Sequence, residues 1–152
     1  MLVRQDRAMA AVAVMLDVGF RVGRGPEVAS GGDIADRLGA AKRGIEPVFQ
    51  ALSRAGLLDS TRGPRGGYRL ARRARDIRLW EIVEAVGPAA EPGEGEAIAA
   101  NPLGRAVLAP LWGEMEGRLR EQLEALTLED LLRRGEAAGL RRPSAPPLNF
   151  VI

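Results

Sequence analysis

A run of arginines and glycines over residues 62–69 is the part of this sequence best suited to chemistry. It reads Arg-Gly-Pro-Arg-Gly-Gly-Tyr-Arg, so Arg62, Arg65 and Arg69 alternate with residues that favour turns. Guanidinium groups stay charged and donate hydrogen bonds to phosphate oxygens. No acid occurs between Asp59 and Asp76. The run predicts a contact with a nucleic acid, and the alternative is an ordinary solvated loop.

The charges around this run are segregated along the chain. The net charge is only +2, but residues 37–78 hold eleven bases and three acids, a net charge of +8. Residues 79–104 hold five glutamates and no base. Lys42 and Arg43 fall in the basic block, which we interpret as an anion-binding surface. The acidic block should face away from a polyanion.

The composition excludes most catalytic chemistry. The 152 residues include no cysteine and no histidine, which removes thiol nucleophiles, disulfides, zinc–thiolate sites and the commonest general base. Glu81 and Glu84 lie one helical turn apart, a spacing that is ordinary on a solvated helix face. We therefore expect no enzyme, no metal site and no cofactor.

Two short helices precede the arginine run. Ser30 stands three residues before Asp33, the spacing of a capping box in which the hydroxyl and the carboxylate each bond to a backbone amide. It predicts a helix over 31–39, and a short turn leads to a second amphipathic helix over 42–55 with Pro47 in its first turn. This order indicates a helix-turn-helix, and the alternative is a helical hairpin in a bundle.

A β-hairpin should follow the second helix. Alternation predicts strands over 57–62 and 68–70 around a glycine-rich turn. In that turn, Gly63, Gly66 and Gly67 would let the backbone come close to a ligand. A helix-turn-helix followed by such a hairpin is the order of a winged helix, which makes a nucleic-acid contact the better interpretation of the arginines.

The second half of the chain predicts a dimer. A short helix over 77–86 should pack on the domain, and residues 89–101 should form a loop or linker. A long helix over 102–126, bent at Pro110, has apolar residues at spacings of three and four. This stripe comprises Leu108, Trp112, Met115, Leu119 and Leu123. The simplest way to bury this stripe is against the same helix of a second subunit, and the alternative is packing against the domain of its own chain.

The chain should close with a capped helix and an extended tail. Thr127 and Asp130 form a second capping-box pair that predicts a helix over 128–138. Residues 141–152 contain three prolines and should be extended. At the other end, the apolar run over 8–16 is far shorter than a membrane span and predicts a first core helix in a cytoplasmic protein without a membrane partner.

The motifs together resemble a known family. The specific part is Arg-Gly-Pro-Arg-Gly-Gly-Tyr-Arg-Leu-Ala over 62–71, supported by Asp-Ile-Ala-Asp-Arg-Leu-Gly over 33–39 and Ala-Gly-Leu-Leu over 55–58. The elements over 77–86 and 127–132 are similar to the family as well. Over about residues 1–134 the chain resembles the Rrf2 family of bacterial winged-helix transcription regulators.

The resemblance implies a homodimer held by the long C-terminal helices on double-stranded DNA. Carried over by position, the major-groove candidates are Lys42, Arg43 and Glu46, and the minor-groove candidate is Arg62 with Arg65 beside it. These roles agree with chemistry, since guanidinium groups read guanine edges, carboxylates accept from cytosine amino groups, and a narrow minor groove attracts arginine.

The chain departs from the family at two places. Cluster-binding members hold an iron–sulfur cluster with three cysteines in the segment equivalent to 91–103, where this chain has none. Glutamates in that segment could contact a hard cation but are usually just solvated. Gly44 and Pro47 stand where relatives commonly have a larger polar or aromatic residue and a glutamine, so the base preference need not follow theirs.

We therefore predict a mainly α fold with a small β-hairpin: a winged helix-turn-helix domain over 1–87, a linker over 88–101, dimerisation helices over 102–140 and a tail over 141–152. The function predicted is a homodimeric repressor that binds a palindromic operator, without an iron–sulfur cluster. Its effector is a small molecule, a protein partner or none. The alternative is a protein-interaction or anti-regulator module that keeps the fold but binds no specific DNA.

Overall fold

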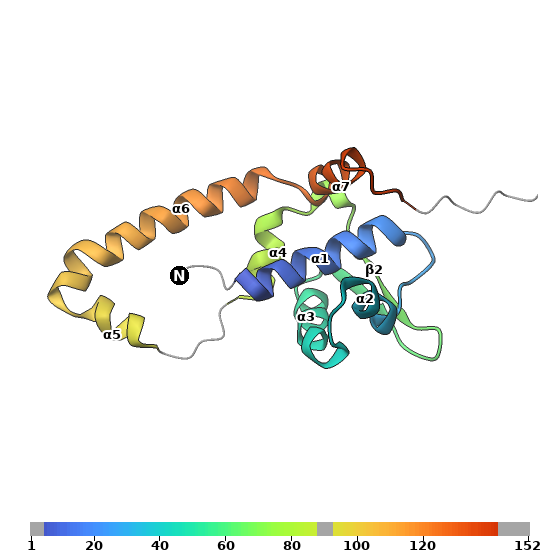
Figure 1. Cartoon of the computed structure of the whole chain (residues 1–152), viewed down its shortest axis with the longest axis horizontal. Coiled ribbons are helices and arrows are strands. Elements are labelled where there is room, and N and C mark those ends of the chain that lie inside the picture. The colour runs from blue at the N-terminus through green and yellow to red at the C-terminus, as the bar shows by residue number, and fades with distance from the viewer. Residues whose placement is uncertain (1–4, 88–92, 143–152) are drawn as a thin grey trace, which may run out of the picture.

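A mainly helical body carries one antiparallel hairpin, and a long helix extends from it (Figure 1). The computed structural model describes residues 5–87 and 93–142. The elements in chain order are α1 (Gln5–Arg21), α2 (Gly31–Leu38), α3 (Lys42–Arg54), β1 (Leu58–Thr61), β2 (Gly67–Leu70), the 3-10 turn η1 (Ala74–Asp76), α4 (Leu79–Ala85), α5 (Glu94–Ala100), the π-helical turn η2 (Gly104–Leu108), α6 (Ala109–Ala125) and α7 (Leu128–Ala137). The predicted fold class is confirmed.

The core lies where α1, α2, α3, α4 and the hairpin meet. Met15 of α1, Ile34 of α2, Phe49 and Leu52 of α3 and Ile82 of α4 are fully buried in one cluster. Each such side chain contributes about 1.5–3 kcal/mol through burial of apolar surface. The cluster fixes the directions in which α3 and the hairpin leave the body.

The helix-turn-helix forms with the predicted cap at Ser30, although only one of the two bonds of the predicted capping box is present. The hydroxyl of Ser30 accepts a hydrogen bond of 3.1 Å from the amide of Asp33, and α2 ends at Gly39, whose φ of 64° is in the left-handed region. Arg37 then ties α2 to α1, because its Nη2 lies 2.7 Å from Oδ2 of Asp17. That hydrogen bond raises the pKa of Arg37, although burial acts in the opposite direction.

The hairpin is held along its outer edge by the loop that precedes α2. β1 and β2 pair from Leu58 with Leu70 to Thr61 with Gly67. Tyr68 also forms a bridge with Ala29, in which the two residues exchange backbone hydrogen bonds of 2.9 and 2.8 Å. Strand β2 is therefore bonded on both sides, to β1 and to the loop before α2, which anchors the base of the hairpin on the body.

Pro47 corrects one expectation. It is the sixth residue of α3, inside the helix and beyond its first turn. A proline here has no amide to donate to the carbonyl of Arg43. The helix begins at Lys42 without a side-chain cap. Burial of Val48 and Phe49 on its inner face compensates for the missing bond.

The loop predicted over 89–101 is wrong for most of its described part, because α5 occupies Glu94–Ala100. Gly104 explains how so short a helix is held. A Cβ atom at this glycine would lie 2.0 Å from the carbonyl oxygen of Ile98, so only glycine permits this approach. The side chain of Asn101 accepts a 2.9 Å hydrogen bond from the amide of Gly104. α5 is therefore fastened to the start of the next helix.

The long C-terminal helix is irregular before Pro110 rather than at it. Residues 102–125 follow one helical path, interrupted by the π-helical turn η2. Pro110 lies in the first turn of α6. A π turn adds one residue to the helical path and so changes which side chains share a face.

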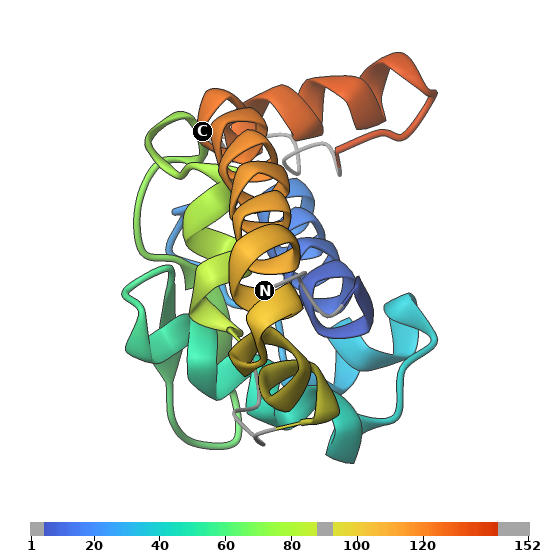
Figure 2. The same cartoon turned by 90° about the vertical axis from the view of Figure 1, so that its left-hand side faces the viewer.

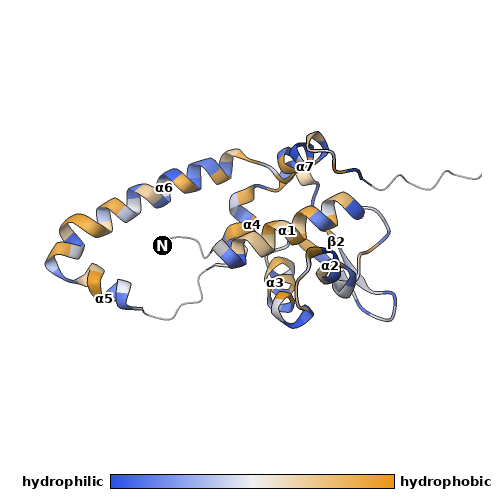
Figure 3. Cartoon of the chain, in the orientation of Figure 1, coloured by the Kyte–Doolittle hydropathy of each residue, from blue (hydrophilic) through white to orange (hydrophobic). Residues whose placement is uncertain are grey.

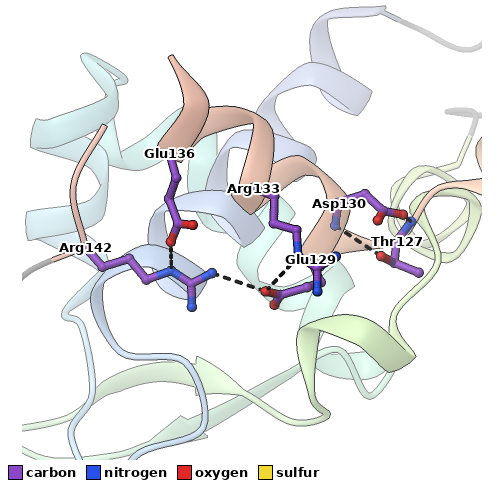
Figure 4. A network of polar contacts seen from close by, with 6 residues as sticks. All are labelled: Thr127, Glu129, Asp130, Arg133, Glu136 and Arg142. Atoms are coloured by element: carbon purple, nitrogen blue, oxygen red, sulfur yellow. Dashed lines mark hydrogen bonds and ion pairs between the residues drawn. The ribbon is translucent and has the colours of Figure 1, made fainter. Parts of the chain in front are cut away.

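Helix α7 closes the body above α1. The capping box of Thr127 and Asp130 is confirmed, with hydrogen bonds of 2.9 and 3.1 Å between each side chain and the other residue's amide (Figure 4). These bonds lower the pKa of Asp130. Arg142 pairs with Glu129 and Glu136, which fixes the chain that follows α7. The predicted tail lies outside the described residues beyond position 142.

No helix in the described ranges is long and apolar enough to cross a membrane.

Candidate nucleic-acid interface

Helix α3 and the hairpin turn lie on the same side of the body. Both are at the lower side in Figure 1, opposite α7, and the view turned by 90° in Figure 2 keeps them there. Lys42 and Arg43 are exposed at the start of α3, and Glu46 is half-buried one turn later. The structure thus places the three predicted major-groove residues together on one outer surface.

An open depression of about 420 Å³ lies on this surface of α3. Its lining consists of Lys42, Arg43, Glu46, Pro47 and Gln50. Sequence reasoning did not single out Gln50. Its spacing of seven from Arg43 and four from Glu46 was the available signal, because residues at these intervals share a helix face.

The hairpin turn presents two more cations. Arg62 is exposed just before, and Arg65 is exposed within, a turn closed by a 2.9 Å hydrogen bond from the Gly66 amide to the Gly63 carbonyl. Gly63 has a φ of 108°, which favours glycine. Across residues 5–87 and 93–142, Arg62 and Arg65 form no ion pair, and the same is true of Lys42 and Arg43. Their charges are available to an external anion.

Arg69 is placed differently from the other predicted contacts. It lies on β2 directly opposite Asp59, and its Nε is 3.8 Å from Oδ2 of that residue. In a strand, alternate side chains point to opposite faces, so Arg69 faces away from its neighbour Tyr68. A nearby carboxylate partly neutralises its charge. The structure does not group Arg69 with the free arginines of the turn.

Two of the three turn glycines serve the hairpin itself. A Cβ atom at Gly66 would lie 2.1 Å from the Thr61 carbonyl oxygen, and one at Gly67 would lie 2.3 Å from the Ala29 carbonyl oxygen. The close approach predicted toward a ligand is therefore, at these positions, an approach to the chain's own backbone. At Gly63 a Cβ atom would meet nothing within 4 Å.

An aromatic stack joins the hairpin to α3. The rings of Tyr68 and Phe49 lie with centroids 4.6 Å apart and an interplanar angle of 21°. Burial raises the pKa of Tyr68, and the negative charge of Glu46 raises it further. Gly31 faces both rings, with its Cβ position 3.2 Å from Phe49 and 3.5 Å from Tyr68. The start of α2, the base of the hairpin and α3 therefore form one packed joint.

The basic block is not one continuous surface. Arg72 donates to Glu81 at 2.6 Å, and Arg73 donates to Asp76 at 2.8 Å. Burial acts to raise the pKa of Glu81, but hydrogen bonds from the Arg78 amide and Arg72 lower it overall. These arginines follow β2 on the way to α4, away from the hairpin turn. They stabilise the body rather than extend the cationic surface of α3.

The apolar stripe of the long helix is partly covered by its own chain. Leu123 packs against the core, and Leu108 and Leu119 are half-buried. Trp112 and Met115 are 42% and 44% exposed. Figure 3 shows apolar residues along α6, η2 and α5. The structure adds exposed apolar side chains that the sequence analysis did not select: Ile98, Leu103, Val107 and Leu111.

These features agree with the comparisons with known proteins. The model of a family described as Rrf2, an iron-dependent transcriptional regulator, matches residues 5–134. The chain belongs to the Rrf2 family. It is 35% identical over 125 residues to the helix-turn-helix transcriptional regulator IscR of Photobacterium profundum, covering 81% of this chain and 71% of that protein.

Solved structures of two regulators have the same fold. The chain resembles T. potens IscR with a TM-score of 0.67 and 27% identity, covering 90% of each chain. It resembles CymR, the global cysteine regulator of B. subtilis, with a TM-score of 0.65 and 25% identity, covering 88% of this chain and 98% of that one. The protein is therefore a helix-turn-helix, DNA-binding transcriptional regulator and not an enzyme.

The iron dependence in the Rrf2 description cannot come from a cysteine-ligated cluster in this chain. A cysteine-ligated iron–sulfur cluster needs thiolates, and the sequence has no cysteine and no histidine. Within the described ranges, no three acidic side chains gather as a metal-binding group. The backbone of Ile98 also packs against Gly104 in this segment. Cysteine ligation of a cluster is excluded by the donor set.

Proposed function

We propose that this Rrf2-family protein is a repressor that binds a palindromic operator as a homodimer. One observation carries the proposal: free cations at the start of α3 and in the hairpin turn lie on the same side of one packed body. As a repressor, the bound dimer would block the access of RNA polymerase to the promoter. Paired subunits would address two half-sites about one helical turn apart.

Each predicted side chain receives a role that its chemistry supports. Lys42 and Arg43 are exposed at the start of α3 and suit phosphate oxygens and guanine edges. Glu46 suits a cytosine amino group. Arg62, with Arg65 beside it, suits the minor groove that adjoins the major groove entered by α3. We assign Arg69 a peripheral phosphate contact, since Asp59 already offsets its charge.

The exposed apolar side chains of η2 and α6 support the dimer. Val107, Leu111 and Met115 follow one another at intervals of four, and Trp112 lies beside them. Exposed apolar residues that cluster on one helix mark protein interfaces. Residues 102–140 would thus form the dimer, while residues 1–87 bind the operator.

Selection from genomic DNA tests this function. The purified protein is mixed with genomic fragments at physiological salt, and retained fragments are sequenced and footprinted. We expect a palindromic motif whose affinity falls steeply as salt rises, since phosphate contacts release counterions. In transcription assays, the protein should silence a promoter that overlaps the motif. Retention of all fragments alike, or of none, would refute operator binding and favour an interaction module.

A further inference from the structure

The outer face of α3 has a proline at its centre. Arg43, Pro47 and Gln50 are all exposed and are spaced at intervals of four and three, so they follow one line along the helix. The opposite face is buried in the core through Val48 and Phe49. Any double helix that contacts the exposed face of α3 therefore meets Pro47 between the two polar side chains.

Pro47 is the only lining residue of the α3 depression whose side chain has no polar atom. The remaining lining residues, Lys42, Arg43, Glu46 and Gln50, surround it with donors and acceptors. The surface next to Pro47 is also free of side-chain bulk, because Gly44 has no side chain and a Cβ atom there would meet nothing within 4 Å. The edge of a base pair can therefore approach the proline ring closely.

The major groove offers one apolar feature that matches such a surface. Purine N7 atoms, carbonyl oxygens and amino groups each need a hydrogen-bond partner, which a proline ring cannot supply. Covering one of them with Pro47 would leave a polar group without its water. The 5-methyl group of thymine needs no partner and gains from being covered.

We propose that Pro47 reads the 5-methyl group of one thymine in each half-site, which makes it a specificity-determining residue. Gln50 supports the same base pair, since a glutamine amide matches the N6 and N7 edge of adenine, the partner of thymine. Contacts of Lys42 and Arg43 with the neighbouring DNA phosphates would keep Pro47 close to this base pair. The inference rests on the proposed operator binding, and it names the base feature that α3 recognises.

Replacing single thymines by deoxyuridine tests the contact, because this change removes only the methyl group and keeps base pairing. Operators from the genomic selection are synthesised with one such replacement at a time, and their affinities are measured by competition. Removing one buried methyl group should weaken binding about fourfold, and replacing the symmetric pair about fifteenfold. All other thymines in the major groove should tolerate the change within about twofold.

The variant Pro47→Gly separates the contact from effects of deoxyuridine on DNA shape. Glycine removes the ring and restores the backbone amide, so α3 should fold at least as well as before. The variant should bind thymine and deoxyuridine operators equally at the sensitive position. Pro47→Ala keeps part of the apolar surface and should retain part of the difference. Circular dichroism of both variants should show the helix content of the wild type.

The outcomes distinguish this inference from the function on which it rests. A thymine whose methyl group matters to the wild type but not to Pro47→Gly supports the contact. A selected operator that tolerates deoxyuridine everywhere, or whose sensitivity persists in Pro47→Gly, overturns it and leaves operator binding in place. If no operator is selected, the proposed function fails first.

Discussion

Substituting Gly67 by alanine should loosen the joint between the hairpin and the body. The new Cβ atom would lie 2.3 Å from the Ala29 carbonyl oxygen, a distance at which the two backbones must move apart. Ala29 and Tyr68 then lose hydrogen bonds of 2.9 and 2.8 Å. At about 1 kcal/mol for each bond, we expect a loss of about 2 kcal/mol in the free energy of unfolding.

Urea denaturation followed by circular dichroism measures this loss. Gly32→Ala is the matched control, because a Cβ atom at that position of α2 meets nothing within 4 Å. Alanine is also the better helix former by about 1 kcal/mol, so the control should be neutral or slightly stabilised. Thermal unfolding should place Gly67→Ala about 4–8 °C below the wild type.

The same variant tests the coupling of the hairpin to α3. A displaced β2 carries Tyr68 away from Phe49, so affinity for a selected operator should fall while dimerisation is unchanged. If Gly67→Ala unfolds at the wild-type urea concentration, the joint is not held by these backbone contacts. If it is destabilised but binds the operator normally, the hairpin does not need to be positioned by α3.

Three further outcomes are expected. Arg62→Ala should weaken operator binding by about 1–3 kcal/mol in gel-shift titrations. Arg69→Ala should have a smaller effect, because Asp59 already lies beside that arginine. Equal losses of affinity in the two variants would contradict this distinction. Leu111→Glu should yield monomers in light scattering, and a persistent dimer would place the interface elsewhere. The pKa of Asp130 is lowered in the fold by its bonds to Thr127, so its contribution is present above the ordinary pKa of aspartate and is lost as the pH falls through the folded value. Acid titration of Asp130→Asn should therefore lack this part of the loss in unfolding free energy shown by the wild type.

Local signals in the sequence were sufficient for much of the fold. Ser30 and Thr127 cap their helices with bonds to residues three positions away, which any reader of the sequence can find. The hairpin turn was likewise predicted from a local signal, the glycines and proline of the arginine–glycine run. Pro47 was misplaced although α3 begins at Lys42 as predicted, because the sixth residue of a helix already lies beyond a first turn of about 3.6 residues.

Features that depend on tertiary contacts were beyond the sequence. The ion pair of Arg69 with Asp59 follows from strand register, which the turn length did not fix. The role of Gly67 depends on Ala29, nearly forty positions away. Leu111 was missed because the predicted stripe passes through its neighbour Trp112, and which apolar side chains of α6 stay exposed depends on tertiary packing.

The stack of Phe49 on Tyr68 has a consequence for any operator. Because α3 and the hairpin share one packed joint, the distance between these two DNA-contacting elements is fixed within a subunit. An extra base pair inserted inside a half-site would move apart the major groove bound by α3 and the minor groove bound by the hairpin. One inserted between half-sites is instead met by the helices that join the subunits, so tolerance to insertions should map the rigid and adjustable parts of the assembly.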